Sequence, residues 1–202
     1  MNLSKIRKIV GGLLVRIVTD SDGTQWMGNG QAFYKVDSAL TITEENAAII
    51  LEVPEDKRKK MSVAEINGKR LTQFSEYPGP GDTELRFVMT VFWRGEPVNI
   101  LMTKDGRAAI VPQAQIAAAE LKDAPTMLAL REIVNPDTGE VRTPCVAVFG
   151  NMLCNALLIP YAWAEAEAIW QAMRDASAES LRYVDSAPQV PMVDEEEGGE
   201  CD

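Results

Sequence analysis

The chain has 202 residues, of which 46% are hydrophobic, 25% charged and 6% aromatic, the profile of an ordinary globular protein. It has no histidine, which excludes Ser-His-Asp and Cys-His catalytic pairs, HExxH zinc sites and His-ligated haem. Its three cysteines, Cys145, Cys154 and Cys201, are too few for a four-thiolate zinc site. We therefore expect no catalytic residue, no metal site and no cofactor.

The charge of the chain is unevenly distributed. Residues 1–70 carry 11 Lys and Arg against 9 Asp and Glu, whereas residues 71–202 carry 9 against 21. Asp194–Asp202 alone supplies six acidic residues and no basic one. Such a segment has too little apolar surface to offset the entropy of ordering, so residues 186–202 are predicted to be a disordered acidic tail. It either solubilises the protein or competes with nucleic acid for the basic first third.

The N-terminal region only partly imitates a targeting signal. Its apolar run follows Lys5, Arg7 and Lys8, stops at Arg16 and lacks a cleavage site of small residues. No run approaches the roughly 18 apolar residues that a membrane span needs. Sparse cysteines without a signal peptide suit a reducing compartment, so we expect a cytoplasmic protein without membrane contact.

Hydrophobic periodicity and turn residues indicate three rounds of strands followed by a helix. The first round opens with a short helix, because its apolar residues lie three to four positions apart from Leu3 to Val10. Thr43 is expected to be the N-cap of a later helix. The ranges predicted for this round are a helix at 3–10, strands at 13–18, 25–27 and 31–36, a helix at 43–51 and a helix starting at Pro54.

A Pro- and Gly-rich loop, residues 77–82, precedes the other two rounds. The predicted ranges are strands at 84–93, 98–103 and 107–111 with a helix at 113–122, then strands at 127–134, 141–149 and 152–159 with a helix at 162–176. This order predicts the α+β class, with antiparallel meanders in three βββ units that alternate with helices. The expected domains are a basic helix-meander-helix unit (1–76), two meander-plus-helix units (77–185) and the tail (186–202).

The last hairpin carries the most local information. Gly150-Asn151 is a favoured two-residue turn, which would pair Phe149 with Met152. Both faces of this hairpin are apolar, so we expect it to be a central element covered on both sides. In the same register Cys145 and Cys154 lie diagonally, about 7 to 8 Å apart, which predicts two free buried thiols.

Two acidic patterns were weighed as sites. Asp20-Ser-Asp22-Gly23 begins like a calcium loop but lacks the third ligand and the glutamate, so a plain hairpin turn is expected. Glu165 and Glu167 lie two positions apart and diverge around a helix rather than converge. A carboxylate-based enzyme therefore stays a minor alternative.

Basic residues in the first third are the strongest functional signal. Most lie in predicted helices, which could present one positive face to phosphate groups, although ordinary solvated surface is the other interpretation. No aromatic RNA-binding motif accompanies them, so we expect contact with the nucleic-acid backbone rather than base readout. The candidate nucleic-acid-binding residues are Lys5, Arg7, Lys8, Lys57, Arg58, Lys59, Lys60, Lys69 and Arg70.

The order of predicted elements resembles the helix-plus-meander units of DNA sliding clamps, over about residues 1–160. The hairpins at Thr19–Gly23 and Thr103–Gly106 and the buried strand ending in Leu157–Pro160 look like clamp meanders. The resemblance implies helices that line a DNA channel within an acidic ring. The chain departs from it in two respects: Gln113–Lys122 contains a single base, and 202 residues is short for a two-domain clamp. More loosely, the chain is similar to small proteins of phages and mobile elements.

These observations lead to one principal hypothesis and two alternatives. The principal hypothesis is a non-enzymatic accessory protein, encoded by a phage or mobile element, that binds a protein partner or the DNA backbone. A homo-oligomer is compatible with this hypothesis. The first alternative is a sliding-clamp-like DNA processivity factor, and the second is the carboxylate-based enzyme.

Overall fold

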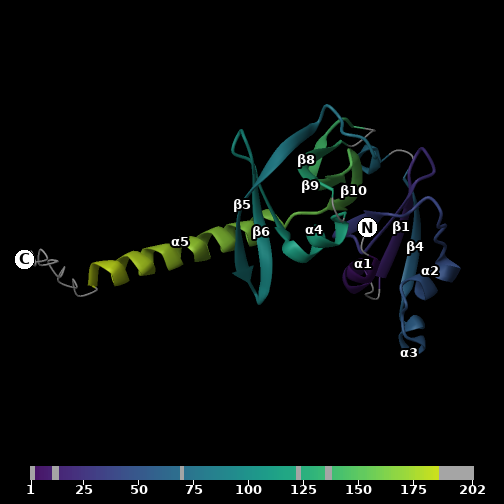
Figure 1. The fold of residues 1–202 in the computed structure, drawn as a ribbon, viewed down its shortest axis with the longest axis horizontal. Helices are drawn as coiled ribbons and strands as arrows, with labels where there is room; N and C mark the ends of the chain where they lie inside the picture. The colour runs from purple at the N-terminus through teal and green to yellow at the C-terminus, as the bar shows by residue number, and fades with distance from the viewer. Residues whose placement is uncertain (1–2, 11–13, 69–70, 122–123, 135–137, 187–202) are drawn as a thin grey trace, which may run out of the picture. The chain divides into compact units, whose positions relative to one another are not determined.

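The computed structural model describes residues 3–10, 14–68, 71–121, 124–134 and 138–186. The chain divides into two compact units, residues 1–162 and residues 163–202. Lys69, Arg70, Cys201 and the predicted disordered tail beyond Ser186 lie outside the described residues. The elements, drawn in Figure 1, are α1 (Leu3–Val10), β1 (Leu14–Thr19), β2 (Gln25–Gly28), β3 (Ala32–Lys35), α2 (Glu44–Ile50), α3 (Glu55–Arg58), β4 (Ser62–Asn67), the 3₁₀ helix η1 (Thr72–Phe74), β5 (Asp82–Trp93), β6 (Glu96–Thr103), β7 (Ala108–Pro112), α4 (Gln113–Ala119), β8 (Thr126–Val134), β9 (Val141–Gly150), β10 (Leu153–Leu158) and α5 (Trp163–Ser186).

The described strands of the first unit form one sheet in the order β4-β1-β2-β3-β10-β9-β8-β5-β6-β7. Neighbouring strands are antiparallel except β1 and β4, which pair in parallel. The α+β class is therefore confirmed, with a mixed sheet. The expectation of purely antiparallel sheets is wrong at β4, where no strand was predicted. Only Val63 and Ile66 are large apolar residues in β4, so its pairing with β1 depends on tertiary context more than on local pattern.

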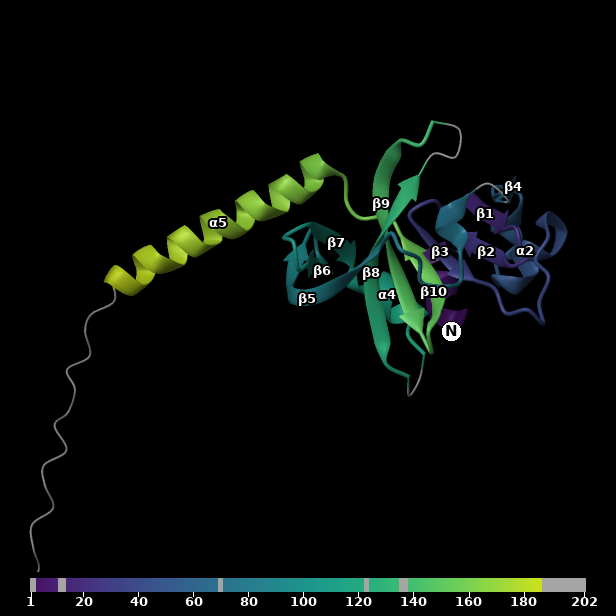
Figure 2. The ribbon, with the colours of Figure 1, turned by 90° about the horizontal axis from the view of Figure 1, so that it is seen from above.

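One face of the sheet is covered by α1, α2 and α4. Ile6 and Val10 from α1 and Ile116 from α4 are buried in the same cluster as Val146 and Val148 of β9. In both views of the ribbon α4 lies close to the strands β8–β10 (Figure 1, Figure 2). The spacing of Ile6 and Val10, four residues apart, puts both on one side of α1. This face holds the larger of the two apolar clusters.

The opposite face is covered by the segment around η1. Phe74 packs edge-on against Trp26 and Phe33, with ring centroids 5.6 Å and 5.3 Å apart. Phe149 of β9 is buried in the same cluster. Because β9 and β10 are interior strands with apolar residues on both faces, the prediction of a central hairpin is confirmed.

The predicted turn of that hairpin is wrong by one residue, so the strand pairing is displaced by two: Phe149 pairs with Cys154 instead of Met152. Asn151 and Met152 form the turn, with φ of 52° and 67°, and Leu153 pairs with Gly150 instead of Met152 with Phe149. A bulge follows at Asn155. A Cβ on Gly150 would lie 2.6 Å from the Asn155 Nδ2. Gly150 is thus the last residue of the strand, and its lack of a side chain leaves space for Asn155. The turn therefore lies one position later in the chain than predicted.

Cys145 and Cys154 are free and buried, as predicted, although the register used for the prediction was wrong. Both belong to the cluster beneath η1. Burial raises the pKa of Cys145 to about 12 and that of Cys154 to about 11. Both thiols are therefore protonated at neutral pH, and a protonated buried thiol is a poor nucleophile.

The turn after β1 is a plain hairpin turn, as predicted. Asp20 Oδ1 accepts hydrogen bonds from the backbone N–H groups of Asp22 and Thr24, both at 2.9 Å, and Gly23 has a φ of 83°. Asp20 Oδ2 accepts a hydrogen bond from the indole of Trp26 at 3.3 Å. The carboxylate that resembled a calcium ligand is thus occupied by donors of the protein itself.

The helices agree with the sequence at their starts better than at their ends. Thr43 is the N-cap of α2 as predicted, and its N–H donates to Asn46 Oδ1 at 2.8 Å. The helix predicted to end at Ala176 continues to Ser186, because the intervening residues contain neither Gly nor Pro and include several strong helix formers. None of the helices in the described ranges combines the length and apolar character needed to cross a bilayer.

Candidate functional site

Two of the three predicted basic residues of α1 have hydrogen bonds that join helices. Arg7 Nε donates to the Ile50 carbonyl at 3.0 Å, and its guanidinium forms an ion pair with Glu52 at 2.6 Å. Lys5 Nζ donates to the Ala117 carbonyl at 3.2 Å. Arg7 therefore ties α1 to the end of α2, which is a structural role, while Lys8 is exposed.

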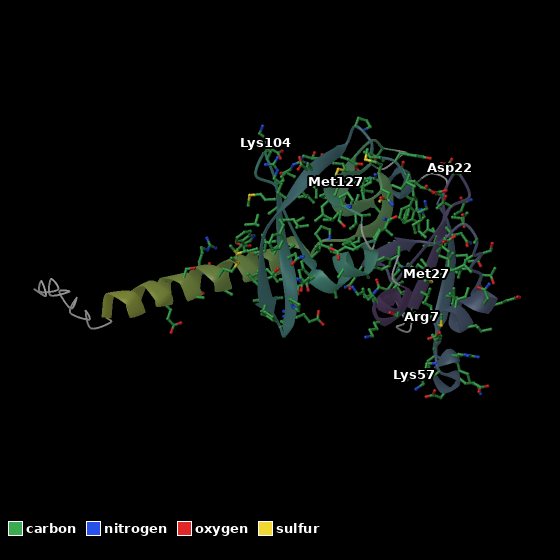
Figure 3. The ribbon with its side chains drawn as sticks, viewed as in Figure 1. Arg7, Asp22, Met27, Lys57, Lys104 and Met127 are labelled. Carbon is green, nitrogen blue, oxygen red and sulfur yellow. The ribbon has the colours of Figure 1, made fainter. Side chains whose placement is uncertain are left out.

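The second basic group lies on α3 and the turn that follows it. Arg58 Nε donates to the Val53 carbonyl at 2.9 Å and caps the preceding turn. Lys57, Lys59 and Lys60 are exposed, and their side chains make no hydrogen bond or ion pair within the part of the chain that the structure describes. Figure 3 shows Lys57 projecting from the end of α3. Among the candidates that the structure describes, these three lysines lie together as an exposed basic group without side-chain partners.

A buried arginine organises the segment between η1 and β5. Arg131 of β8 binds both carboxylate oxygens of Asp82 at 2.8 Å, and the two side chains are only 6% and 7% exposed. The same guanidinium donates to the carbonyls of Gln73, Ser75 and Tyr77 at 2.7 to 3.0 Å. The planar fork of arginine suits such a five-bond arrangement, so Arg131 fixes the path of residues 73–77.

The hydrogen bonds of Arg131 position Glu76 near the start of β2 and the end of β3. Glu76 Oε2 accepts from Lys35 Nζ at 2.6 Å and Oε1 accepts from Thr24 Oγ1 at 2.6 Å. Partial burial alone would raise the pKa of Glu76, but the hydrogen bonds from Lys35 and Thr24 outweigh it and hold the pKa below its ordinary value. The carboxylate is therefore ionised and already paired at neutral pH.

A polar pocket of about 680 Å³ lies beside this pair. Lys35, Glu76, Asp22 and Asp37 contribute its charged groups, and Asn155 of the β10 bulge also lines it. Two of these charges neutralise each other in the ion pair between Lys35 and Glu76. No group of three or more Cys, Asp or Glu suited to a metal ion occurs within the described ranges.

The most exposed apolar side chains of any strand lie on the outer half of β5. We call Phe87, Val88, Met89 and Phe92 the edge surface; they are 59%, 43%, 41% and 80% exposed. β5 pairs with β8 only through residues 82–85, whereas it pairs with β6 as far as Trp93. Figure 1 shows the β5–β6 hairpin extending past β8.

Residues 86–93 of β5 consequently have an open edge. No described strand pairs with them on the side opposite β6. Backbone N–H and C=O groups of a strand alternate between its two neighbours, so every second residue of this stretch leaves its backbone groups without a partner strand. An apolar, unpaired edge of this kind is a template for another strand.

Sequence analysis did not identify the edge surface as a functional feature. It predicted the strand at 84–93, but not its exposure. The available signal was the run Phe87–Trp93, seven residues without a charge, Gly or Pro, which is typical of strands that pair with other chains when exposed. The Lys35–Glu76 pair was also missed, because its members are far apart in the sequence.

Comparison with known proteins adds no relative: no protein-family model, no curated protein and no solved structure matches this chain.

Proposed function

We propose that this protein is a non-enzymatic binding protein that contacts another polypeptide through the edge surface of β5. The observation that carries the proposal is Phe92, 80% exposed on a strand whose outer edge has no partner within the described strands. An extended segment added to this edge would satisfy the backbone groups and cover the apolar side chains together. On the predicted division into three meander-plus-helix units, this surface belongs to the second unit.

The edge has few of the devices by which proteins usually protect exposed strands. Such edges carry lysines, prolines, inward-pointing charges or bulges, or are very short; of these, β5 has a bulge at Val88. The run Phe87–Trp93 contains no lysine, proline or charged residue. Single exposed apolar residues are common on protein surfaces, whereas four of them within six positions of a strand with an open edge are typical of an interaction site.

The arrangement around the pocket favours binding over catalysis. A general base works best when its pKa lies near the operating pH, but the pKa of Glu76 is lowered. The Lys35 side chain donates a hydrogen bond to that carboxylate and is held in an ion pair. The thiols of Cys145 and Cys154 are buried and protonated at neutral pH.

A second candidate function is contact with the phosphate backbone of nucleic acid, supported by the exposed group Lys57, Lys59 and Lys60. Three unpaired ammonium groups close together on one short element can neutralise phosphates without reading bases. The acidic residues Glu55 and Asp56 on the same element weaken this field, so we rank the candidate second.

Peptide display against the full-length chain tests the principal proposal. Selected peptides should be extended and alternate in hydrophobicity, and they should bind the wild type but not a Phe92→Lys variant. Ile49→Lys is the matched control, since Ile49 is 63% exposed on α2, and it should retain binding. Hydrogen exchange should show new protection at residues 86–93 in the bound state. Peptides that bind wild type and Phe92→Lys equally would overturn the proposal.

A further inference from the structure

We infer that the polypeptide bound at the edge surface is a second copy of this chain, joined antiparallel, β5 to β5, about a two-fold axis. This inference rests on the proposed function, because it names the partner of that same surface. Two identical strands can pair about a two-fold axis only when the residues of the strand fit opposite the same residues running in the reverse direction. The run Phe87–Trp93 meets this condition, since no like charges are brought opposite each other within it.

The register of β5 selects the centre of such a pairing. A bulge at Val88 interrupts its pairing with β6, so the regular alternation of faces extends from Met89 to Trp93. Residues directly opposite each other in an antiparallel pair lie on the same face of the sheet. A two-fold axis that passes through Val91 meets this condition. It sets Thr90 of each copy opposite Phe92 of the other, and Met89 opposite Trp93.

This pairing brings together side chains that stabilise neighbouring strands. Thr90 and Phe92 lie on the same face, because their β6 partners Asn99 and Pro97 are two residues apart. Aromatic and β-branched residues directly opposite each other are among the more stabilising cross-strand pairs. The two most exposed side chains, Phe87 and Phe92, lie on one face, so each copy would cover the exposed rings of the other.

The area available is enough for a dimer of modest affinity. Each buried aromatic side chain removes roughly 150 to 250 Å² from water, and both copies contribute Phe87 and Phe92 together with the smaller Val88 and Met89. Because Phe87 and Phe92 are 59% and 80% exposed, the four rings contribute roughly 400 to 700 Å². The total therefore stays below the roughly 1,000 Å² of a stable specific interface and fits a weak, transient dimer. We expect a dimer that dissociates on dilution, with a dissociation constant on the order of 10 μM.

The oligomeric state of the full-length chain tests the inference. Sedimentation velocity over about 1 to 500 μM should show a reversible monomer–dimer equilibrium in the wild type. Phe92→Lys should weaken the dimer by roughly a hundredfold, because it buries one charge per copy near the axis. Ile49→Lys should leave the equilibrium unchanged, and both variants should keep the wild-type circular dichroism. A wild type that is monomeric at every concentration overturns the inference.

A charge-pairing experiment tests the two-fold geometry itself. In the proposed register residue 92 of one copy lies diagonally across from residue 92 of the other, about 7 to 8 Å away. Phe92→Lys and Phe92→Glu should each be monomeric because like charges meet, whereas their mixture should form a one-to-one heterodimer. Both substitutions are at residue 92. Association on mixing would also show that both variants are folded, because unfolded chains could not form the heterodimer. Failure of the mixture to associate overturns the two-fold pairing.

The two proposals fail in different ways. A monomeric wild type whose edge still binds displayed peptides, with loss in Phe92→Lys, would reject the second copy as partner and keep the binding function. A dimer that Phe92→Lys does not weaken would place the dimer interface elsewhere and reject the inference. A monomer whose edge binds no peptide would reject both.

Discussion

Glu76 joins three parts of the fold through one carboxylate. Its backbone path is set by Arg131, which binds the carbonyls on both sides of it, Ser75 and Tyr77, and its oxygens accept from Lys35 and Thr24. A half-buried ion pair of this kind is stabilising mainly because losing one partner leaves the other unpaired. The strength of the contact therefore depends on the ionisation of Glu76.

Replacing Glu76 by Gln should destabilise the protein by about 2 kcal/mol at neutral pH, because Lys35 then loses its charged partner. The lowered pKa of Glu76 in the folded state means that this contribution is complete above the ordinary glutamate pKa of about 4.3. It is lost as the pH falls through the lower folded-state pKa. Urea denaturation of both proteins at neutral and acidic pH measures the difference, which should shrink on acidification.

Glu120→Gln is the control for this experiment. Glu120 is exposed and makes no side-chain hydrogen bond or ion pair within the described residues, so its substitution should change stability by less than about 0.5 kcal/mol at either pH. A Glu76→Gln protein that is as stable as wild type at neutral pH would show that the Lys35–Glu76 pair contributes no net stability.

At the scale of elements, the β9–β10 turn is strained at one residue. Met152 has a φ of 67° and is 74% exposed, and the left-handed region costs an L-residue roughly 1 to 2 kcal/mol. Met152→Gly would create the favoured Asn-Gly turn without removing buried contacts. It should stabilise the protein by roughly 0.5 to 1 kcal/mol, part of the gain being lost to glycine's freedom in the unfolded chain.

Thermal unfolding measures this change as a rise in the melting temperature. The substitution Asn151→Ala should instead lower the melting temperature. Asn151 also has a positive φ, 52°, which asparagine tolerates better than alanine. If Met152→Gly lowered the melting temperature, the assignment of Asn151 and Met152 as the turn would be wrong, and the predicted Gly150-Asn151 turn would have to be reconsidered.

The same hairpin shows what the sequence could and could not predict. Its two apolar faces revealed a central position, because burial on both sides leaves a direct pattern in the residues. Its register could not be predicted from the sequence. Gly150-Asn151 and Asn151-Met152 are both possible turns that differ by one residue, and which of them forms depends on the bulge at Asn155. β4 was missed for a related reason: its few apolar residues gain a partner only when β1 is already in place.

The candidate surfaces show the same limit. The exposed lysines of α3 could be predicted, because a basic run on a short helix needs no distant partner. Arg7 and Lys5 could not be assigned to structural roles, since their acceptors at Ile50 and Ala117 are distant in sequence. The edge surface is defined by where β8 stops pairing with β5, a property of the assembled sheet and not of the strand alone.

At the scale of the whole molecule, the charge distribution opposes nucleic-acid binding except at α3. The chain has a net charge of −10, which repels phosphate at long range. On the second candidate function, affinity comes from local contacts of Lys57, Lys59 and Lys60, and it should decrease steeply as salt screens them. This separates the second candidate function from protein binding at the edge surface, which is apolar and should depend little on salt.

The double variant Lys57→Glu/Lys60→Glu should abolish any binding of duplex DNA in fluorescence anisotropy at low salt, while leaving stability within about 1 kcal/mol because both residues are exposed. Lys104→Glu/Arg174→Glu changes the net charge equally at positions outside α3 (Figure 3 labels Lys57 and Lys104), and it should retain binding. Equal losses in both variants would show that only net charge matters. Wild-type binding with no salt dependence would contradict phosphate contact, since neutralising phosphates releases counterions.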